Sequence, residues 1–144
     1  KRYKDVHFDI CYCSPLVRAR RTAELLLEGR KVPIVIDERL REMSFGAYEG
    51  TENCFEIPDC PIRVFFKAPE KYVAPEGAES MEELFARTGA FLDEIALPAV
   101  KEGRDVLIVG HGAMNSAIIT KVRNNPLEKF WDEEIKNCKL IQLI

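Results

Sequence analysis

Three arginines lie in the segment SPLVRARRTAEL, where the spacing of apolar residues predicts that a helix begins: Arg18, Arg20 and Arg21. The first turn of a helix carries free N–H groups and the positive end of the helix dipole, so cations are disfavoured there. A bound anion would offset this repulsion, and a guanidinium can bind two phosphate oxygens at once. The segment therefore suggests a phosphate site, with three solvated surface arginines as the alternative.

A second candidate for chemistry is His111, which stands between the apolar run DVLIVG and the helical pattern HGAMNSAIITKV. The next residue, Gly112, would let a ligand approach the backbone closely. A structural histidine is the alternative. If the strands before these two junctions are parallel, Arg18 and His111 lie at the same edge of the sheet, which is where open α/β sheets bind ligands.

Strands and helices must alternate to place these residues. This pattern predicts the α/β class, a three-layer α/β/α sandwich with a mostly parallel sheet. The expected strands are HFDICYC, the run at 32–36, DVLIVG at 105–110 and CKLIQLI at the end of the chain. The expected helices begin after Ser14 as N-cap, after Ser80 in a capping box with Glu83, and after His111. The helix after Ser80 should run to about Leu97, with Pro98 ending or bending it.

Length and composition bound the fold and its partners. The chain has 144 residues, 47% of them hydrophobic, and a net charge of -3. We expect a single domain over residues 1–144 that is not drawn electrostatically to nucleic acid or to anionic membranes. No apolar run reaches the length of a membrane span, and the first residues lack the apolar segment of a signal peptide, so we expect a cytoplasmic protein.

The five cysteines are odd in number and scattered, which fits reduced thiols better than a disulfide framework. In a strand, Cys11 and Cys13 would point to the same face of the sheet. A zinc site formed by these two cysteines and His7 is the alternative, but its spacing would be unusually short. We therefore expect no metal and no cofactor.

Four motifs in order resemble the histidine phosphatase superfamily, the phosphoglycerate mutase-like proteins. SPLVRARRTAEL resembles its Ser-Pro-Leu-x-Arg-Ala-x-x-Thr-Ala motif, and LREMSFGAYEG resembles its glutamate loop. PEGAESMEEL is similar to its Gly-x-Glu-Ser helix start, and VLIVGHGAMN to the strand that bears its second histidine. The resemblance implies that Arg18 holds the phosphoryl group, that His111 and the Gly112 amide complete the pocket, and that Glu42 is the general acid.

The family's nucleophile is another histidine, in an Arg-His-Gly motif on the first strand, and this sequence has no such motif. The resemblance therefore implies a chain that is incomplete at its N-terminus and lacks the first central strand. We expect neither His7 nor His111 to form the phosphohistidine. Ala113 and Asn115 stand where relatives often have glycine and arginine.

The resemblance implies a phosphatase that hydrolyses a small phosphate monoester through a phosphohistidine in the complete protein. A phosphoglycerate mutase is the first alternative, but mutases tend to carry a longer insertion than the 28 residues between Gly50 and Glu79. A phosphate-binding or regulatory domain without catalysis is the second. Glu42 argues against it, because a binding site gains nothing from a carboxylate beside an anion.

Overall fold

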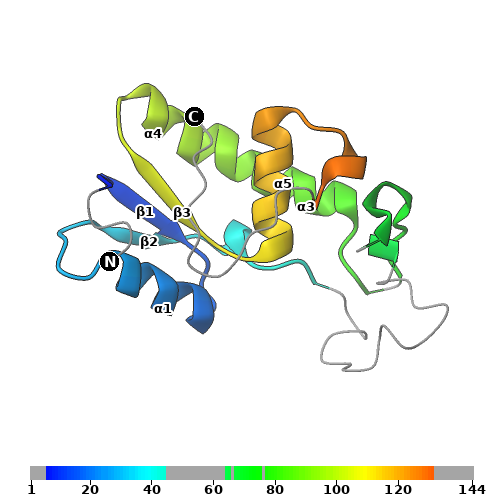
Figure 1. Cartoon of the computed structure of the whole chain (residues 1–144), viewed down its shortest axis with the longest axis horizontal. Coiled ribbons are helices and arrows are strands. Elements are labelled where there is room, and N and C mark those ends of the chain that lie inside the picture. The colour runs from blue at the N-terminus through cyan, green and yellow to red at the C-terminus, as the bar shows by residue number, and fades with distance from the viewer. Residues whose placement is uncertain (1–5, 45–63, 66, 76, 132–144) are drawn as a thin grey trace.

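The computed structural model describes residues 6–44, 64–65, 67–75 and 77–131 (Figure 1). Its sheet consists of β1 (Ile10–Cys13), β2 (Ile34–Ile36) and β3 (Val106–Val109), in the order β2-β1-β3. Both pairings are parallel, as the sequence predicted. Among the described strands β1 is the central one. The expected strand CKLIQLI lies outside the described residues.

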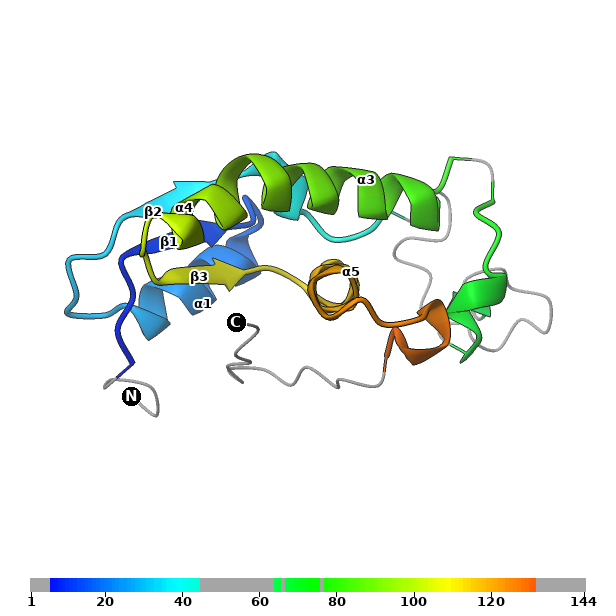
Figure 2. The same ribbon diagram turned by 90° about the horizontal axis from the view of Figure 1, so that it is seen from above.

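One face of the sheet is covered by α1 (Val17–Leu26), as Figure 2 shows. Cys11 and Cys13 point to this face, where they pack with Ala19 and Ala23. Burial raises the pKa of Cys11 to about 12 and that of Cys13 to about 11. These two thiols are thus protonated core residues, as one of the two alternatives for them predicted.

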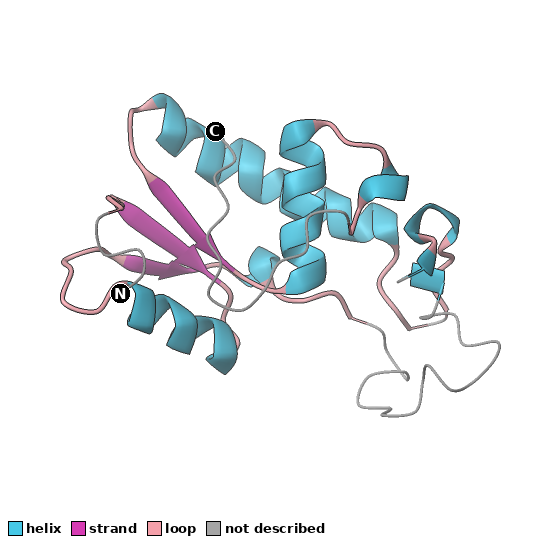
Figure 3. Ribbon diagram, viewed as in Figure 1, coloured by secondary structure: helices cyan, strands magenta, loops and turns pink. Residues whose placement is uncertain are grey.

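The opposite face of the sheet is covered by a long helical segment and by α5 (Gly112–Arg123), so the helices form two layers around the sheet (Figures 2 and 3). Tyr12 of β1 points to this face and meets the Phe91 ring edge-on, with 5.5 Å between ring centroids. The predicted α/β fold with helices on both faces is confirmed.

The long helical segment has three parts: α3 (Met81–Phe91), a π-helical turn at Leu92–Ala96, and α4 (Leu97–Lys101). The predicted capping box is present, with hydrogen bonds in both directions between Ser80 and Glu83. The helix does not end near Leu97. Pro98 lies in the first turn of α4, where the wider π turn before it accommodates the missing N–H.

The start of α1 differs from the expectation. The N-cap is Leu16, and Ser14 lies outside the helix. The Ser14 N–H donates to the Val109 carbonyl at 3.0 Å, which continues the pairing of β1 with β3 beyond the strands. Ser14 therefore belongs to the end of the sheet, and its Oγ accepts a 3.3 Å hydrogen bond from the Leu16 N–H.

His7 lies at the other end of these strands, where β1 and β3 begin. Its Nδ1 lies 2.8 Å from Oδ2 of Asp105 and its Nε2 lies 3.4 Å from Oδ1 of Asp9. The three side chains are exposed, and among the described residues their ligand atoms lie close enough together to hold a cation. The group does not include Cys11 or Cys13, the cysteines of the alternative zinc site. Each imidazole nitrogen already faces a carboxylate, so the group ties the two strand starts together.

This group predicts a pH-dependent contribution to stability. The hydrogen bond with Asp105 and the charge of Asp9 raise the pKa of His7. The contribution is therefore fully present below the unfolded pKa of about 6.5 and is lost as the pH rises through the higher folded value. His7→Gln should lower Tm more at about pH 6 than at about pH 9. In an Asp105→Asn background the difference should shrink; an equal drop in Tm at both pH values would contradict the assignment.

Candidate functional site

The two strand-to-helix junctions singled out in the sequence lie side by side. Ser14 follows β1 and His111 follows β3, and Cys13 pairs with Val109 at the ends of these parallel strands. From there the chain enters α1 on one face of the sheet and α5 on the other (Figure 1). The structure thus brings the start of α1 and His111 to one edge of the sheet, as expected from the parallel strands.

His111 is the N-cap residue of α5 and is partly buried. Its Nε2 lies 2.8 Å from Oγ of Ser14. Burial lowers the pKa of His111; the charge of Glu42 opposes this shift, and those of Arg18 and Arg87 add to it. This environment favours the neutral imidazole near pH 7.

Glu42 reaches the start of α5 from a distant part of the chain. Its Oε1 accepts hydrogen bonds from the N–H groups of Met43 and Met114 at 3.0 and 3.1 Å. Its Oε2 accepts one from the Ala113 N–H at 3.2 Å. The carboxylate thus satisfies two of the free N–H groups of the helix and lies at the positive end of its dipole.

Gly112 lies beside this carboxylate. A Cβ atom built on Gly112 would be 3.9 Å from Oε2 of Glu42, the nearest atom that the described residues would bring to it. Glu42, His111 and Gly112, three of the four predicted site residues, therefore meet at the start of α5. The Gly112 amide was expected to bind phosphate. The next two N–H groups of the helix start, those of Ala113 and Met114, bind the Glu42 carboxylate in this structure.

Arg18, the fourth predicted site residue, lies exposed in the first turn of α1. That turn has no acidic residue, and the N-cap makes no side-chain hydrogen bond. Burial is the main cause that lowers the pKa of His111, and the charge of Arg18 adds to it. The charge of Arg20 instead partly opposes the rise that burial causes in the pKa of Cys13. The two arginines thus act on different groups, and Arg18 is the one whose charge reaches the site.

A pair that the sequence analysis did not identify holds the Glu42 segment. Nε and one terminal nitrogen of Arg87 donate to the Glu79 carboxylate at 2.6 and 3.1 Å. Its other terminal nitrogen donates to the Arg39 carbonyl at 2.6 Å. Glu79 also binds Ser44 twice, through its side chain at 3.2 Å and its backbone N–H at 2.7 Å. The segment is thus fixed on both sides of Glu42.

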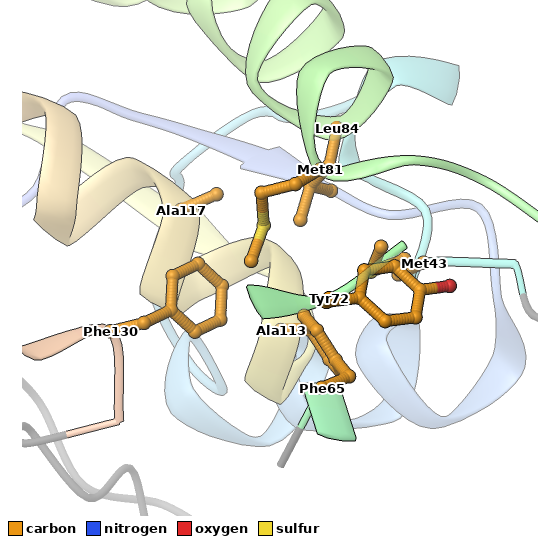
Figure 4. Close-up of a cluster of buried hydrophobic side chains, with 8 residues drawn as sticks. All are labelled: Met43, Phe65, Tyr72, Met81, Leu84, Ala113, Ala117 and Phe130. Carbon is orange, nitrogen blue, oxygen red and sulfur yellow. The ribbon is translucent and has the colours of Figure 1, made fainter. Parts of the chain in front are cut away.

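An apolar cluster, shown in Figure 4, includes a residue of the same segment. It contains Met43, the neighbour of Glu42, and Ala113, the neighbour of Gly112. Phe65 and Tyr72 complete the contact around Met43, which is 2% exposed. The backbone that carries Glu42 and the start of α5 therefore share one core.

Arg87→Gln is expected to lower the free energy of unfolding by about 2 to 3 kcal/mol, because it leaves the Glu79 carboxylate mostly buried and without its cation. Denaturant unfolding at constant m-value measures the loss. Glu82→Gln, an exposed change on the same helix, is the control and should stay within about 0.5 kcal/mol of the parent protein. Equal effects of the two substitutions would show that the Arg87 pair does not hold this segment.

None of the described helices is long and apolar enough to cross a membrane.

Known proteins are similar to this chain in sequence, and solved structures are similar to it in fold. A mutase of Cytophaga hutchinsonii, "2,3-bisphosphoglycerate-dependent phosphoglycerate mutase", is 31% identical over 93% of this chain and 62% of its own length. The "Adenosylcobalamin/alpha-ribazole phosphatase" of Salmonella typhimurium is 31% identical over 86% of this chain and 61% of its own. The solved structure of Bacillus stearothermophilus YhfR superimposes with a TM-score of 0.76 at 31% identity, covering 90% of this chain and 64% of that protein.

This chain therefore spans less than two thirds of the length of each of these three relatives. The family described as "Histidine phosphatase superfamily (branch 1)" matches residues 1–144. The motifs found in the sequence, the parallel sheet and these relatives agree, and the chain belongs to the histidine phosphatase superfamily.

Proposed function

We propose that the protein is a phosphatase that hydrolyses a small phosphate monoester, with Arg18 and His111 binding the phosphoryl group and Glu42 acting as general acid. The observation that carries the proposal is the meeting of Glu42 and His111 at the start of α5. A cation, a hydrogen-bonding imidazole and a carboxyl group around one strand edge are the groups that phosphoryl transfer needs. The cytoplasmic location expected from the sequence is part of the same proposal.

The hydrogen bonds of Glu42 indicate which oxygen would carry the catalytic proton. Each carboxyl oxygen offers two lone pairs, and Oε1 uses both on N–H groups. Among the described residues, Oε2 accepts one hydrogen bond, from the Ala113 N–H, which leaves one lone pair for a proton. Oε2 is also the oxygen next to Gly112, where the missing side chain leaves room for a ligand. The leaving oxygen would take its proton from Oε2.

In the proposed reaction a histidine nitrogen attacks phosphorus and the bond to the ester oxygen breaks. Glu42 gives its proton to that oxygen, and the alcohol leaves. Water then attacks the phosphohistidine, giving inorganic phosphate and restoring the histidine, while Glu42 recovers a proton from the attacking water. Neither histidine of this chain is proposed as the nucleophile. His7 lies at the opposite end of the strands, and Nε2 of His111 is hydrogen-bonded to Ser14.

The test uses the full-length protein and a panel of alkyl and aryl phosphate monoesters, with release of inorganic phosphate as the readout. Acid-labile, alkali-stable phosphate on the protein during turnover would support the phosphohistidine. A second activity has support from the mutase relative. Interconversion of phosphoglycerates that depends on 2,3-bisphosphoglycerate, with little phosphate release, would favour a mutase. No turnover on any ester would overturn the proposal.

A further inference from the structure

The hydrogen bond between Ser14 and His111 bears on which nitrogen of the imidazole is protonated. Ser14 is 0% exposed, and its backbone is held by the hydrogen bond from its N–H to the Val109 carbonyl. Its Oγ lies 2.8 Å from Nε2 of His111 and 3.3 Å from the Leu16 nitrogen. The hydroxyl therefore occupies a fixed position between the start of α1 and the imidazole.

The donors and acceptors of this group decide where the protons lie. The Leu16 N–H can only donate, so Ser14 Oγ accepts from it and still has its own proton to give. Among the described residues, Nε2 of His111 is the remaining hydrogen-bond partner of this hydroxyl. If Nε2 carried a proton, the buried hydroxyl proton would lose that acceptor, which costs free energy. Each donor in this group has an acceptor when the Ser14 O–H donates to an unprotonated Nε2.

We infer that Ser14 is a positioning residue: its hydroxyl holds Nε2 of His111, so that the neutral ring keeps its proton on Nδ1 and presents that N–H to the phosphoryl group. The hydrogen bond at one ring nitrogen sets the protonation of the other. The inference rests on the proposed function, because the phosphoryl group is the partner that Nδ1–H would bind. The tautomer itself does not depend on that function.

Burial agrees with a neutral imidazole, because it is the main cause that lowers the pKa of His111. The charge of Glu42, in the segment after η1 (Glu38–Leu40), opposes this shift, whereas Arg18 of α1 and Arg87 of α3 add to it. His111 would thus act as a hydrogen-bond donor, and Arg18 would supply the positive charge.

The experiment is a nitrogen NMR spectrum of the full-length protein labelled at histidine, recorded with and without inorganic phosphate. This chain contributes two imidazoles, and His7→Gln assigns them. We expect His111 to be neutral and protonated at Nδ1 near pH 7.5, and its Nδ1 signal to move when phosphate binds. Ser14→Ala should populate the Nε2–H tautomer and lower kcat/KM by about tenfold, the worth of one hydrogen bond. Ser14→Thr keeps the hydroxyl and should restore the tautomer.

Thr88→Val is the control for loss of a buried hydroxyl, since the Thr88 Oγ1 donates to the Leu84 carbonyl within α3. It should leave the His111 tautomer and kcat/KM unchanged. A wild-type His111 that is protonated at Nε2 overturns the inference, as does an unchanged tautomer in Ser14→Ala. If Ser14→Ala does not fold, the wild-type spectrum alone decides. If no ester is turned over but the Nδ1–H tautomer is present and requires Ser14, the proposed function fails while the positioning of His111 by Ser14 stands.

Discussion

Arg18→Ala in the full-length protein is expected to lower kcat/KM about 1,000-fold, close to 4 kcal/mol of transition-state stabilisation. The size of the effect follows from the lack of a replacement cation. Burial favours a neutral His111, and Arg87 is bound to Glu79. Arg18 is then the cation in the described part of the site that has no carboxylate partner, so its loss leaves the phosphoryl charge without that counter-charge.

The matched control is Arg20→Ala, which removes the same charge from the same helix two residues later. Arg20 is exposed, and His111 is not among the groups whose pKa its charge is found to shift, so its loss should change kcat/KM less than about threefold. Steady-state kinetics on one aryl phosphate are enough for the comparison. Equal losses in the two variants would mean that the basic helix start attracts substrate by its total charge, and the assignment of Arg18 would be wrong.

The local signals in the sequence predicted the layers of the fold and placed the candidate residues at one edge of the sheet. The capping box of Ser80 and Glu83 needs only residues three apart, and the structure has both of its hydrogen bonds. Likewise, an apolar run followed by a helical pattern was enough to place His111 at a strand end. Parallel strands then bring such ends to one edge, so the approach of the α1 start to His111 followed from the fold class.

The contacts that orient the side chains were not predictable in this way. Arg87 reaches the Arg39 carbonyl, 48 residues earlier, and no periodic pattern records such a pair. Ser14 shows the other difficulty, because serine suits both an N-cap and a hydrogen bond to a side chain. From the sequence, Ser14 was predicted to be the N-cap of the helix. The backbone bond to Val109 keeps Ser14 in the sheet and turns its hydroxyl to His111 instead.

Glu42→Gln should slow the hydrolysis of alkyl phosphates by about 100-fold to 10,000-fold, because an alkoxide leaves poorly unless it receives a proton. An aryl phosphate with a good leaving group needs little protonation and should be slowed far less. The substitution also disturbs the structure. The glutamine amide keeps one oxygen, and its NH2 group would face N–H donors where Oε1 or Oε2 of Glu42 now accepts hydrogen bonds.

The two effects can be separated by measuring both substrates on each variant. Disturbance of the α5 start alters the phosphoryl pocket, so it lowers kcat for alkyl and aryl esters by the same factor. Loss of the catalytic proton lowers kcat for the alkyl ester far more than kcat for the aryl ester. The ratio of alkyl to aryl kcat therefore reports the general acid, and Glu42→Gln should reduce that ratio at least about 30-fold, within the range for a general acid. Arg87→Gln, which loosens the Glu42 segment but leaves the carboxyl group in place, should change it much less. An unchanged ratio in Glu42→Gln would assign Glu42 to capping α5, and the catalytic proton would have to come from another group.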